Sequence, residues 1–387
     1  MKKRLDLISL LRRRFSRPRG AEVRKADDFF YTGGSSFSGR DRPSASFRTV
    51  ISRCLEDWRG DPLARRIVSL TTQFSVGRGF RISADDPAAD EFLHEFWEHP
   101  LNRMDARLLE WSDELCRAGN LFVMISSDES GMSYVRAIPA GLIEEIVSQE
   151  NDVEQPAFFR VREFSGNGEM RVPELHTIRP ASLSEPGEGR GMLHFTVNRA
   201  LGAQWGEPDL APMVNWLYCY REWLTDRYQL NHFRSQFMYL VKSPGMTEPE
   251  RGLRERQLNF KKPSRGTILV VNGDEEWQAM QPNFGSSDAN EDGLAIKKMI
   301  AAGAGIPVSF LAEPGSVSRA ESGGMEDSAC RNFRQRQQTL LWITETVLRH
   351  VLARGAHVRR NLNRDTEIHV YGDDIAAPGM TEGGIIK

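Results

Sequence analysis

Residues 290–354 read NEDGLAIKKMIAAGAGIPVSFLAEPGSVSRAESGGMEDSACRNFRQRQQTLLWITETVLRHVLAR, and the fold depends on how this stretch is arranged. Apolar residues at helical spacing predict a first helix over roughly Glu291–Ala304. That helix is expected to end within Gly303–Pro307, because two glycines and a proline so close together cannot continue it. Apolar residues recur at helical spacing again up to Leu352, which predicts a long second helix over 325–354.

The connection between these helices, residues 306–324, is expected to be a flexible loop. A short apolar segment, Val308–Ala312, comes first and is followed by a Pro-Gly turn. The spacing of Ser318 and Glu321 is that of a capping box, but Gly323 and Gly324 weaken a helix that restarts there. Such a loop can present backbone and small side chains to something that moves past it. The alternative is an ordinary helix–loop–helix connection.

The composition is that of a globular protein with a real core. A chain of 387 residues can form one large domain or two to three modest ones. Its net charge of −2 argues against a protein that coats nucleic acid tightly, since such binding needs many unopposed cations. The four cysteines lie far apart and form no CxxC pair, so we expect free thiols in a reducing compartment: Cys54, Cys116, Cys219 and Cys330.

The N-terminal 46 residues differ from the rest. Residues 1–25 contain ten lysines and arginines against Asp6 and Glu22. This basic arm is typical of a membrane-surface helix, a nucleic-acid arm, a docking tail for a partner protein, or simply a mobile solvated tail. Residues 31–46 are rich in glycine and serine and predict a loop or linker.

The folded body is expected to begin near Phe47, with an α+β pattern. Asp61–Val68 opens a helix with proline at a tolerated first-turn position, and a strand follows at Phe80–Ser83. Helices are predicted over 87–118. Short strands are predicted after them, and we expect these to form one sheet of neighbouring strands: Leu121–Ser126, Tyr134–Ile138, Ile143–Val147, Phe158–Phe164 and Leu193–Thr196.

A long helix is predicted from Pro208 onward, with apolar residues repeating at three and four. Trp216 and Trp223 lie off that stripe, so we expect protein to cover more than one face. A strand at Phe237–Val241, a short basic helix and a strand at Gly266–Asp274 follow, and Glu276–Met280 is expected to pair back as a hairpin. The basic residues of this region are Arg251, Arg254, Arg256, Lys261 and Lys262.

The order of these segments resembles the portal proteins of tailed bacteriophages, the head-to-tail connectors. The resemblance spans roughly residues 47–375 and rests on several weak signals in the right order. The matching segments are Asp61–Val68 with Val76–Gly79, Leu193–Phe195 leading to Gly206–Leu210, Gly266–Val270 and Ala301–Leu311.

The resemblance implies an α+β portal fold divided into named parts. Residues 1–46 form the basic arm and linker, 47–208 the wing, 209–235 the stem helix, 236–286 the clip and 287–305 the second stem helix. A tunnel loop then occupies 306–324, and a long helix, a returning wing strand at Glu367–Tyr371 and a short tail fill 325–387. Since the chain ends soon after that strand, a reduced or absent crown is expected.

The resemblance also implies function and partners. Portal proteins form rings, typically of twelve subunits, at one capsid vertex, and double-stranded DNA is packaged and ejected through them. Expected partners are other copies of the chain, DNA, the terminase large subunit, the major capsid protein and scaffold, and a head-completion adaptor. The expected location is the virion, and the host cytoplasm during assembly. The alternative function is a basic-arm adaptor that binds membrane surface or nucleic acid.

Two candidate sites follow from the resemblance. The tunnel loop is expected to face DNA, and its candidate residues are Pro314, Gly315, Ser316, Val317, Ser318, Arg319 and Glu321. A near-neutral loop suits a polyanion that must slide, because strong fixed contacts would hold it. The clip is expected to dock the packaging motor through the basic run Arg251, Arg254, Arg256, Lys261 and Lys262.

The sequence predicts no enzyme, no cofactor and no metal site. It contains no Walker A, HExxH or GxSxG pattern, so any motor that hydrolyses ATP is expected to be a partner. Residues Asp288–Gly293 match the first half of a calcium loop, but the twelfth position is Met299 instead of a bidentate glutamate. We interpret Asp288 as a helix N-cap.

Overall fold

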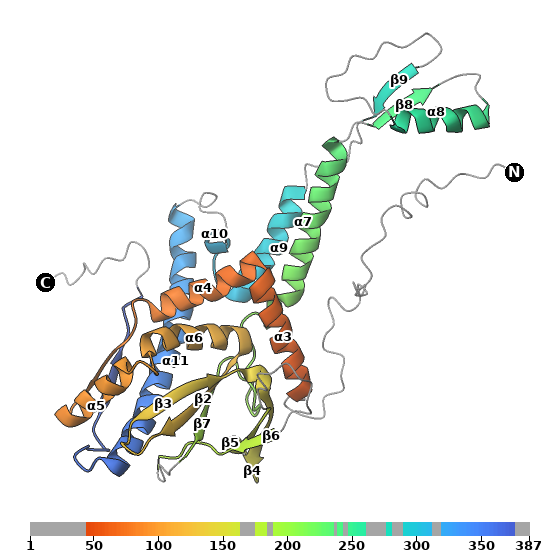
Figure 1. Ribbon diagram of the computed structural model, residues 1–387. Coiled ribbons are helices and arrows are strands. Elements are labelled where there is room, and N and C mark those ends of the chain that lie inside the picture. The colour runs from red at the N-terminus through yellow and green to blue at the C-terminus, as the bar shows by residue number, and fades with distance from the viewer. Residues whose placement is uncertain are drawn as a thin grey trace.

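The computed structural model describes residues 44–162, 175–183, 189–235, 238–242, 247–260, 276–280, 289–311 and 319–375. It has a mixed helix and sheet body, from which two helices rise side by side as a stem that carries a small unit at its far end (Figure 1). The predicted α+β class is confirmed. The basic arm lies outside the described residues.

The body begins with two consecutive helices, α3 (Ser44–Gly60) and α4 (Pro62–Val76). The Asp61 carboxylate accepts hydrogen bonds from the amides of Leu63 and Ala64, at 2.8 and 3.2 Å, and so caps α4. Pro62 occupies the first turn of α4, where its missing N–H costs nothing, as the sequence predicts.

The next elements are β1 (Arg81–Ala84), α5 (Pro87–Glu98) and α6 (Met104–Ala118). Strand β1 pairs antiparallel with β10 (Ile368–Tyr371), from the far end of the chain. The predicted return of a C-terminal strand to the body is therefore confirmed. Gly119 ends α6 with φ +68° and allows the Glu207 backbone to approach so closely that a Cβ would lie 2.4 Å from it.

The remaining body strands form two three-stranded antiparallel sheets, where the sequence suggested one. The first has the order β3-β2-β7, from Ser133–Ile138, Asn120–Ser127 and Gly191–Thr196. The second has the order β4-β5-β6, from Ile143–Gln149, Asp152–Arg162 and Leu175–Ile178. A single 3₁₀ turn, Ala140–Leu142, joins β3 to β4 and so links the two sheets.

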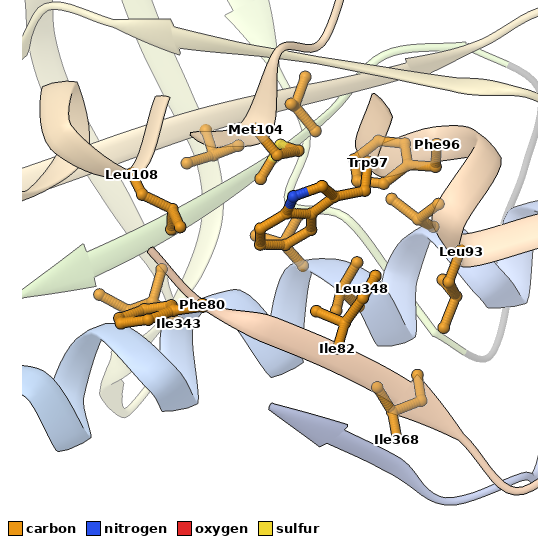
Figure 2. Packing of buried hydrophobic residues seen from close by; sticks show 14 of the residues in the cluster. Phe80, Ile82, Leu93, Phe96, Trp97, Met104, Leu108, Ile343, Leu348 and Ile368 are labelled. Atoms are coloured by element: carbon orange, nitrogen blue, oxygen red, sulfur yellow. The ribbon is translucent and has the colours of Figure 1, made fainter. Parts of the chain in front are cut away.

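The largest core cluster lies between the first sheet, α5, α6 and the C-terminal helix α11. Figure 2 shows Trp97 at its centre, with Met104 and Leu108 of α6 close by and Ile343 and Leu348 of α11 in the same cluster. These side chains are at most 7% exposed. Burying an apolar side chain of this size contributes about 2 kcal/mol, so α11 is held in the body along much of its length.

The stem consists of α7 (Val214–Ser235), which follows a 3₁₀ turn at Ala211–Met213, and α9 (Ala289–Ala304). At 1.5 Å per residue, α7 is about 33 Å long. At its far end lie β8 (Met238–Lys242), α8 (Glu248–Phe260) and β9 (Glu276–Met280) (Figure 1). Strand β9 pairs with β8, while the predicted strand at 266–274 lies outside the described residues.

After α9 come the four-residue helix α10 (Val308–Leu311) and the 40-residue helix α11 (Arg319–Val358). The sequence predicted that this helix would become firm at residue 325, after Gly323 and Gly324. In the structure it begins at Arg319 and passes through both glycines without a break. Residues 312–318 lie outside the described part, as does Asp288, the proposed N-cap of α9.

Candidate functional site: the loop before α11 and the base of the stem

The structure describes the two flanks of the predicted tunnel loop. Pro314, Gly315, Ser316, Val317 and Ser318 lie outside the described residues. Arg319 and Glu321 lie in the first turn of α11, and only their backbone is described. The loop thus spans the ends of α10 and α11, so the contacts of these two helices determine where it is presented.

Helix α10 is fixed to the body by a polar contact and by stacked rings. The Arg66 side chain on α4 donates a hydrogen bond from Nε to the Phe310 carbonyl, at 3.2 Å. The Phe74 ring stacks on Phe310 with centroids 6.1 Å apart, and on Phe333 with centroids 4.7 Å apart. Phe74 of α4 therefore lies between one residue of α10 and one of α11, and ties both sides of the loop to the same helix.

The turn between α9 and α10 is tied to α11 as well. The Asn332 side chain on α11 donates a hydrogen bond from Nδ2 to the Gly305 carbonyl, at 3.0 Å. Leu311 and Phe333 belong to the same buried cluster as Ile300 of α9. The stem base, α10 and the loop-proximal part of α11 therefore share one core.

A buried ion pair connects this region to the start of the stem. Arg336 of α11 donates from Nη2 to both carboxylate oxygens of Asp209, at 2.7 and 2.8 Å. Burial alone would lower the pKa of Arg336, but the attraction of Asp209 outweighs it and the net pKa is raised. Burial, followed by the nearby Asp209 carboxylate, raises the pKa of Cys116, so this neighbouring thiol stays protonated.

A second ion-pair group holds α7 to the first two helices of the body. Arg221 on α7 lies 2.9 Å from Asp57 and 3.4 Å from Asp61. Burial raises the pKa of Asp57, and Arg221 opposes that shift. Asp61, which caps α4, thus also pairs with Arg221 of the stem helix, and it does so directly after the end of α3.

The two stem helices contact through aromatic side chains and a glycine. Trp223 of α7 lies directly over Gly293 of α9, where an added Cβ would be 2.4 Å from the indole. The Tyr220 ring stacks on Trp223 and lies 5.6 Å from the Lys297 ammonium. These contacts explain why Trp223 lies off the main apolar stripe of α7: it is the residue that faces α9.

The predicted clip residues lie at the far end of the stem. Arg251, Arg254 and Arg256 are on α8, whereas Lys261 and Lys262 lie just outside the described residues. Helix α8 also contains Glu248, Glu250 and Glu255, so its own charge is balanced. Arg256 is exposed to solvent.

The described part of the chain contains one group of side chains that could hold a metal ion. Asp85, Glu367 and His369 bring ligand atoms within 4.8 Å of one another, at the end of the β1–β10 pair. His369 Nε2 lies 3.1 Å from Asp85 Oδ1, and both side chains are well exposed. The group is an ordinary surface ion pair with a neighbouring carboxylate. Among the described helices, none is long and apolar enough to cross a membrane.

Sequence reasoning missed three parts of this region. It did not predict α3, although Phe47, Ile51, Cys54 and Trp58 recur at helical spacing and gave a usable signal. The pairs Asp209–Arg336 and Asp57–Arg221 join residues 127 and 164 positions apart, and no local pattern indicates them.

Comparison with solved structures finds the same fold elsewhere. No protein-family model matches the chain, and no curated protein is similar to it in sequence. A chain in the virion of the native gene transfer agent particle is 14% identical, with a TM-score of 0.56 over 88% of this chain and 86% of the other. A chain in the neck of that particle, computed with C12 symmetry, is 13% identical, with a TM-score of 0.58 over 87% and 86%.

A further structure is that of an HK97-family phage portal protein from Corynebacterium diphtheriae. It is 12% identical and has a TM-score of 0.43, over 82% of this chain and 94% of the other. At these identities the two particle chains establish the fold. This chain shares that fold over 87–88% of its length.

Proposed function

We propose that this chain is the portal subunit of a tailed bacteriophage or a phage-like particle. In this role, copies form a ring at one capsid vertex, and double-stranded DNA passes through the central channel during packaging and ejection. The observation that carries the proposal is the fold shared with a chain in a particle neck computed with C12 symmetry, over 87% of this chain. The role is structural, so ATP hydrolysis would belong to a partner motor.

The contacts of the two helices that flank the loop, and the composition of the loop itself, support the channel role. Helices α10 and α11, which residues 312–318 connect in the sequence, are both held to α4 through Phe74. The loop sequence contains glycine, proline and serine and few charges, while the chain as a whole has a net charge of −2. A low density of fixed cations allows a polyanion to slide, because each firm phosphate contact would add to the friction.

The unit at the far end of the stem is proposed to dock the terminase motor and later a head-completion protein. It lies at the far end of α7, a helix about 33 Å long, where a partner can reach it. Helix α8 is balanced in charge, and residues 236–286 contain seven lysines and arginines against six aspartates and glutamates. A basic docking surface on this unit would therefore be local, at Lys261 and Lys262 after the helix. The remaining proposed partners are the major capsid protein and the scaffold.

The direct test is imaging of the purified chain. Negative-stain electron microscopy is expected to show rings with a central hole, and native mass spectrometry is expected to give a mass that is a whole multiple of 43.9 kDa, twelve copies being the expected number. Sedimentation velocity over a hundredfold range of concentration provides the control for partial assembly. Solitary particles without a hole at every concentration would contradict the proposal.

A further inference from the structure

Arg354 of α11 is buried in the body, and within the described part of the chain no carboxylate pairs with it. The residue is 6% exposed. Its two hydrogen bonds both come from Nη1 and both go to neutral oxygens, the Gly189 carbonyl at 2.8 Å and the Ser127 hydroxyl at 3.4 Å. Burial lowers the pKa of Arg354, and no nearby carboxylate opposes that shift. A buried cation without a counter-ion is costly, so proteins ordinarily pair such a group.

One edge of the guanidinium has no protein partner. The Nε atom is buried and has no hydrogen-bond partner, and Nη2 donates no hydrogen bond to a described residue. Nε and Nη2 lie side by side on the planar group, so their two parallel N–H donors match two oxygens of a phosphate or a carboxylate. The contacts of Nη1 thus fix the guanidinium in place and leave its Nε–Nη2 edge available.

A second unpaired donor group lies on the same face of α11. His350 precedes Arg354 by four residues and is also 6% exposed, and its Nδ1 atom is buried without a hydrogen-bond partner. Burial, and then the charge of Arg354, lowers the pKa of His350 to about 4, so the ring is neutral at neutral pH. A neutral imidazole still carries one N–H and can donate it to an anion.

The space beside the guanidinium is narrow. Gly191, the first residue of β7, has no side chain there, and an added Cβ would lie 2.9 Å from Nη2 and 2.8 Å from Ala181. Gly189, which accepts from Nη1, is exposed, so the group lies close to the surface of the body. A small ligand suits this position better than a long side chain from another part of a protein.

We infer that the Nε–Nη2 edge of Arg354 binds a small free oxyanion of the phosphate class, with His350 as a further donor. The site lies where α11 crosses the end of β2, at Ser127, and the start of β7, at Gly191. The anion supplies the negative charge that the described residues do not, and it ties α11 to the first sheet. The inference concerns a single chain and does not rest on the proposed function.

The first experiment compares thermal unfolding of the full chain in sodium phosphate and in sodium chloride, at equal ionic strength and neutral pH. Phosphate is expected to raise the unfolding temperature along a saturating curve. Arg354→Lys keeps the charge but loses the fork, and is expected to need about ten times more phosphate for half the effect. The control, Arg349→Lys, changes an exposed arginine of the same helix and is expected to respond like the wild type. Phosphate also stabilises proteins non-specifically, but that part is common to all variants.

The second experiment locates the anion in the wild type, so it does not depend on whether Arg354→Lys folds. Amide hydrogen exchange followed by mass spectrometry is measured in phosphate and in chloride. Phosphate is expected to slow exchange in the peptides that contain Ser127, Gly191 and 350–354, and to leave α8 unchanged. Slower exchange elsewhere, or none at these three places, contradicts the inference.

The third experiment tests whether a carboxylate of the chain itself takes this position. Glu185 and Glu188 precede Gly189 in the sequence and lie outside the described residues. If phosphate stabilises only Glu185→Gln/Glu188→Gln and not the wild type, one of these carboxylates already pairs with Arg354 and the inference is wrong. It is also wrong if Arg354→Lys and Arg349→Lys respond equally. None of these results depends on ring formation, so the proposed function is tested separately.

Discussion

At the scale of single residues, the structure concentrates its polar interactions where the stem meets the body. Arg336 and Asp209 form a two-hydrogen-bond pair whose side chains are only 13% and 19% exposed. The Nη1 atom of Arg336 is also buried and has no hydrogen-bond partner among the described residues. The guanidinium therefore depends on Asp209, and the pair is expected to be sensitive to removal of the carboxylate.

Replacing Asp209 with alanine is expected to lower the free energy of unfolding by about 3 kcal/mol, because it leaves a buried guanidinium without a counter-ion. Urea denaturation followed by circular dichroism measures the change. The matched control is Glu345→Ala, which breaks the exposed i,i+4 pair with Arg349 and is expected to cost about 0.5 kcal/mol. Equal effects of the two substitutions would show that the Asp209 pair is not buried in solution.

Two histidines, the half-buried His194 and the buried His350, are expected to make the body sensitive to acid. Burial, and secondarily Arg199, lowers the pKa of His194 from 6.5 to about 3, and burial beside Arg354 lowers that of His350 to about 4. As the pH falls below 6.5, both histidines therefore become protonated in the unfolded chain, whereas in the folded chain they stay neutral until the pH is much lower. Stability is fully present above that pH and falls as the pH drops, by about 1.4 kcal/mol per pH unit for each such histidine.

The substitution His194→Gln is expected to flatten the decline in unfolding free energy between pH 6.5 and 4. Glutamine cannot be protonated in this range and can still donate to the Asn120 side chain, which lies 3.1 Å from His194 Nε2. Denaturant titrations at half-unit steps of pH measure the slope. The exposed His357 supplies the control, and His357→Gln is expected to leave the slope as it is. An unchanged slope in His194→Gln would contradict the assignment.

At the scale of elements, the stem hairpin depends on one glycine. Gly293→Ala would place a Cβ 2.4 Å from the Trp223 ring, so the indole or the helix must move. Faster amide hydrogen exchange is expected in α7 and α9, although alanine favours helix by about 1 kcal/mol over glycine. The control Gly252→Ala on α8 meets nothing within 4 Å and is expected to slow exchange locally. Equal exchange in the wild type and Gly293→Ala would mean that the two helices do not pack as described.

Elements with strong local signals could be predicted, and the others could not. Helix α4 was predicted because Asp61 and Pro62 mark its start whatever lies around it. The start of α11 was placed too late, since Gly323 and Gly324 weaken a helix locally while the 40-residue helix is stabilised by its long packed section. The division into two sheets escaped prediction because strand partners are set by contacts distant in sequence.

At the scale of the whole molecule, the order of segments carried more information than any single motif. The body, the stem helices and the returning strand β10 were predicted from that order, whereas the ion pairs that hold them together were not. For the tunnel loop, the structure describes only the two flanks. For the basic run of the clip, it describes the helix α8 but not Lys261 and Lys262. Their roles toward DNA and the motor remain predictions that assembled particles can test.

Replacing Arg319 and the adjacent loop serines with alanine (Ser316→Ala/Ser318→Ala/Arg319→Ala) is expected to impair DNA packaging or retention while rings still form. The loop is proposed to meet the moving DNA, and the three substitutions leave the packed part of α11 and the rest of the body unchanged. Nuclease-protected DNA per particle and negative-stain imaging are the two measurements. Arg349→Ala, on an exposed part of α11, is the control expected to package normally. If the loop variant packages as much DNA as the wild type, these loop residues have no role in packaging.

The continuity of α11 determines how the loop can respond to mechanical load. Its first residue adjoins the loop, and its buried side chains between Ala329 and Ala353 lie in close-packed cores. A push along the axis of such a rod must shear those cores, and so it meets high stiffness. A force perpendicular to the helix axis bends only the first few turns of α11 and meets little resistance. The loop should therefore yield across the helix and resist along it, with a direction-dependent compliance that force spectroscopy on single rings can measure.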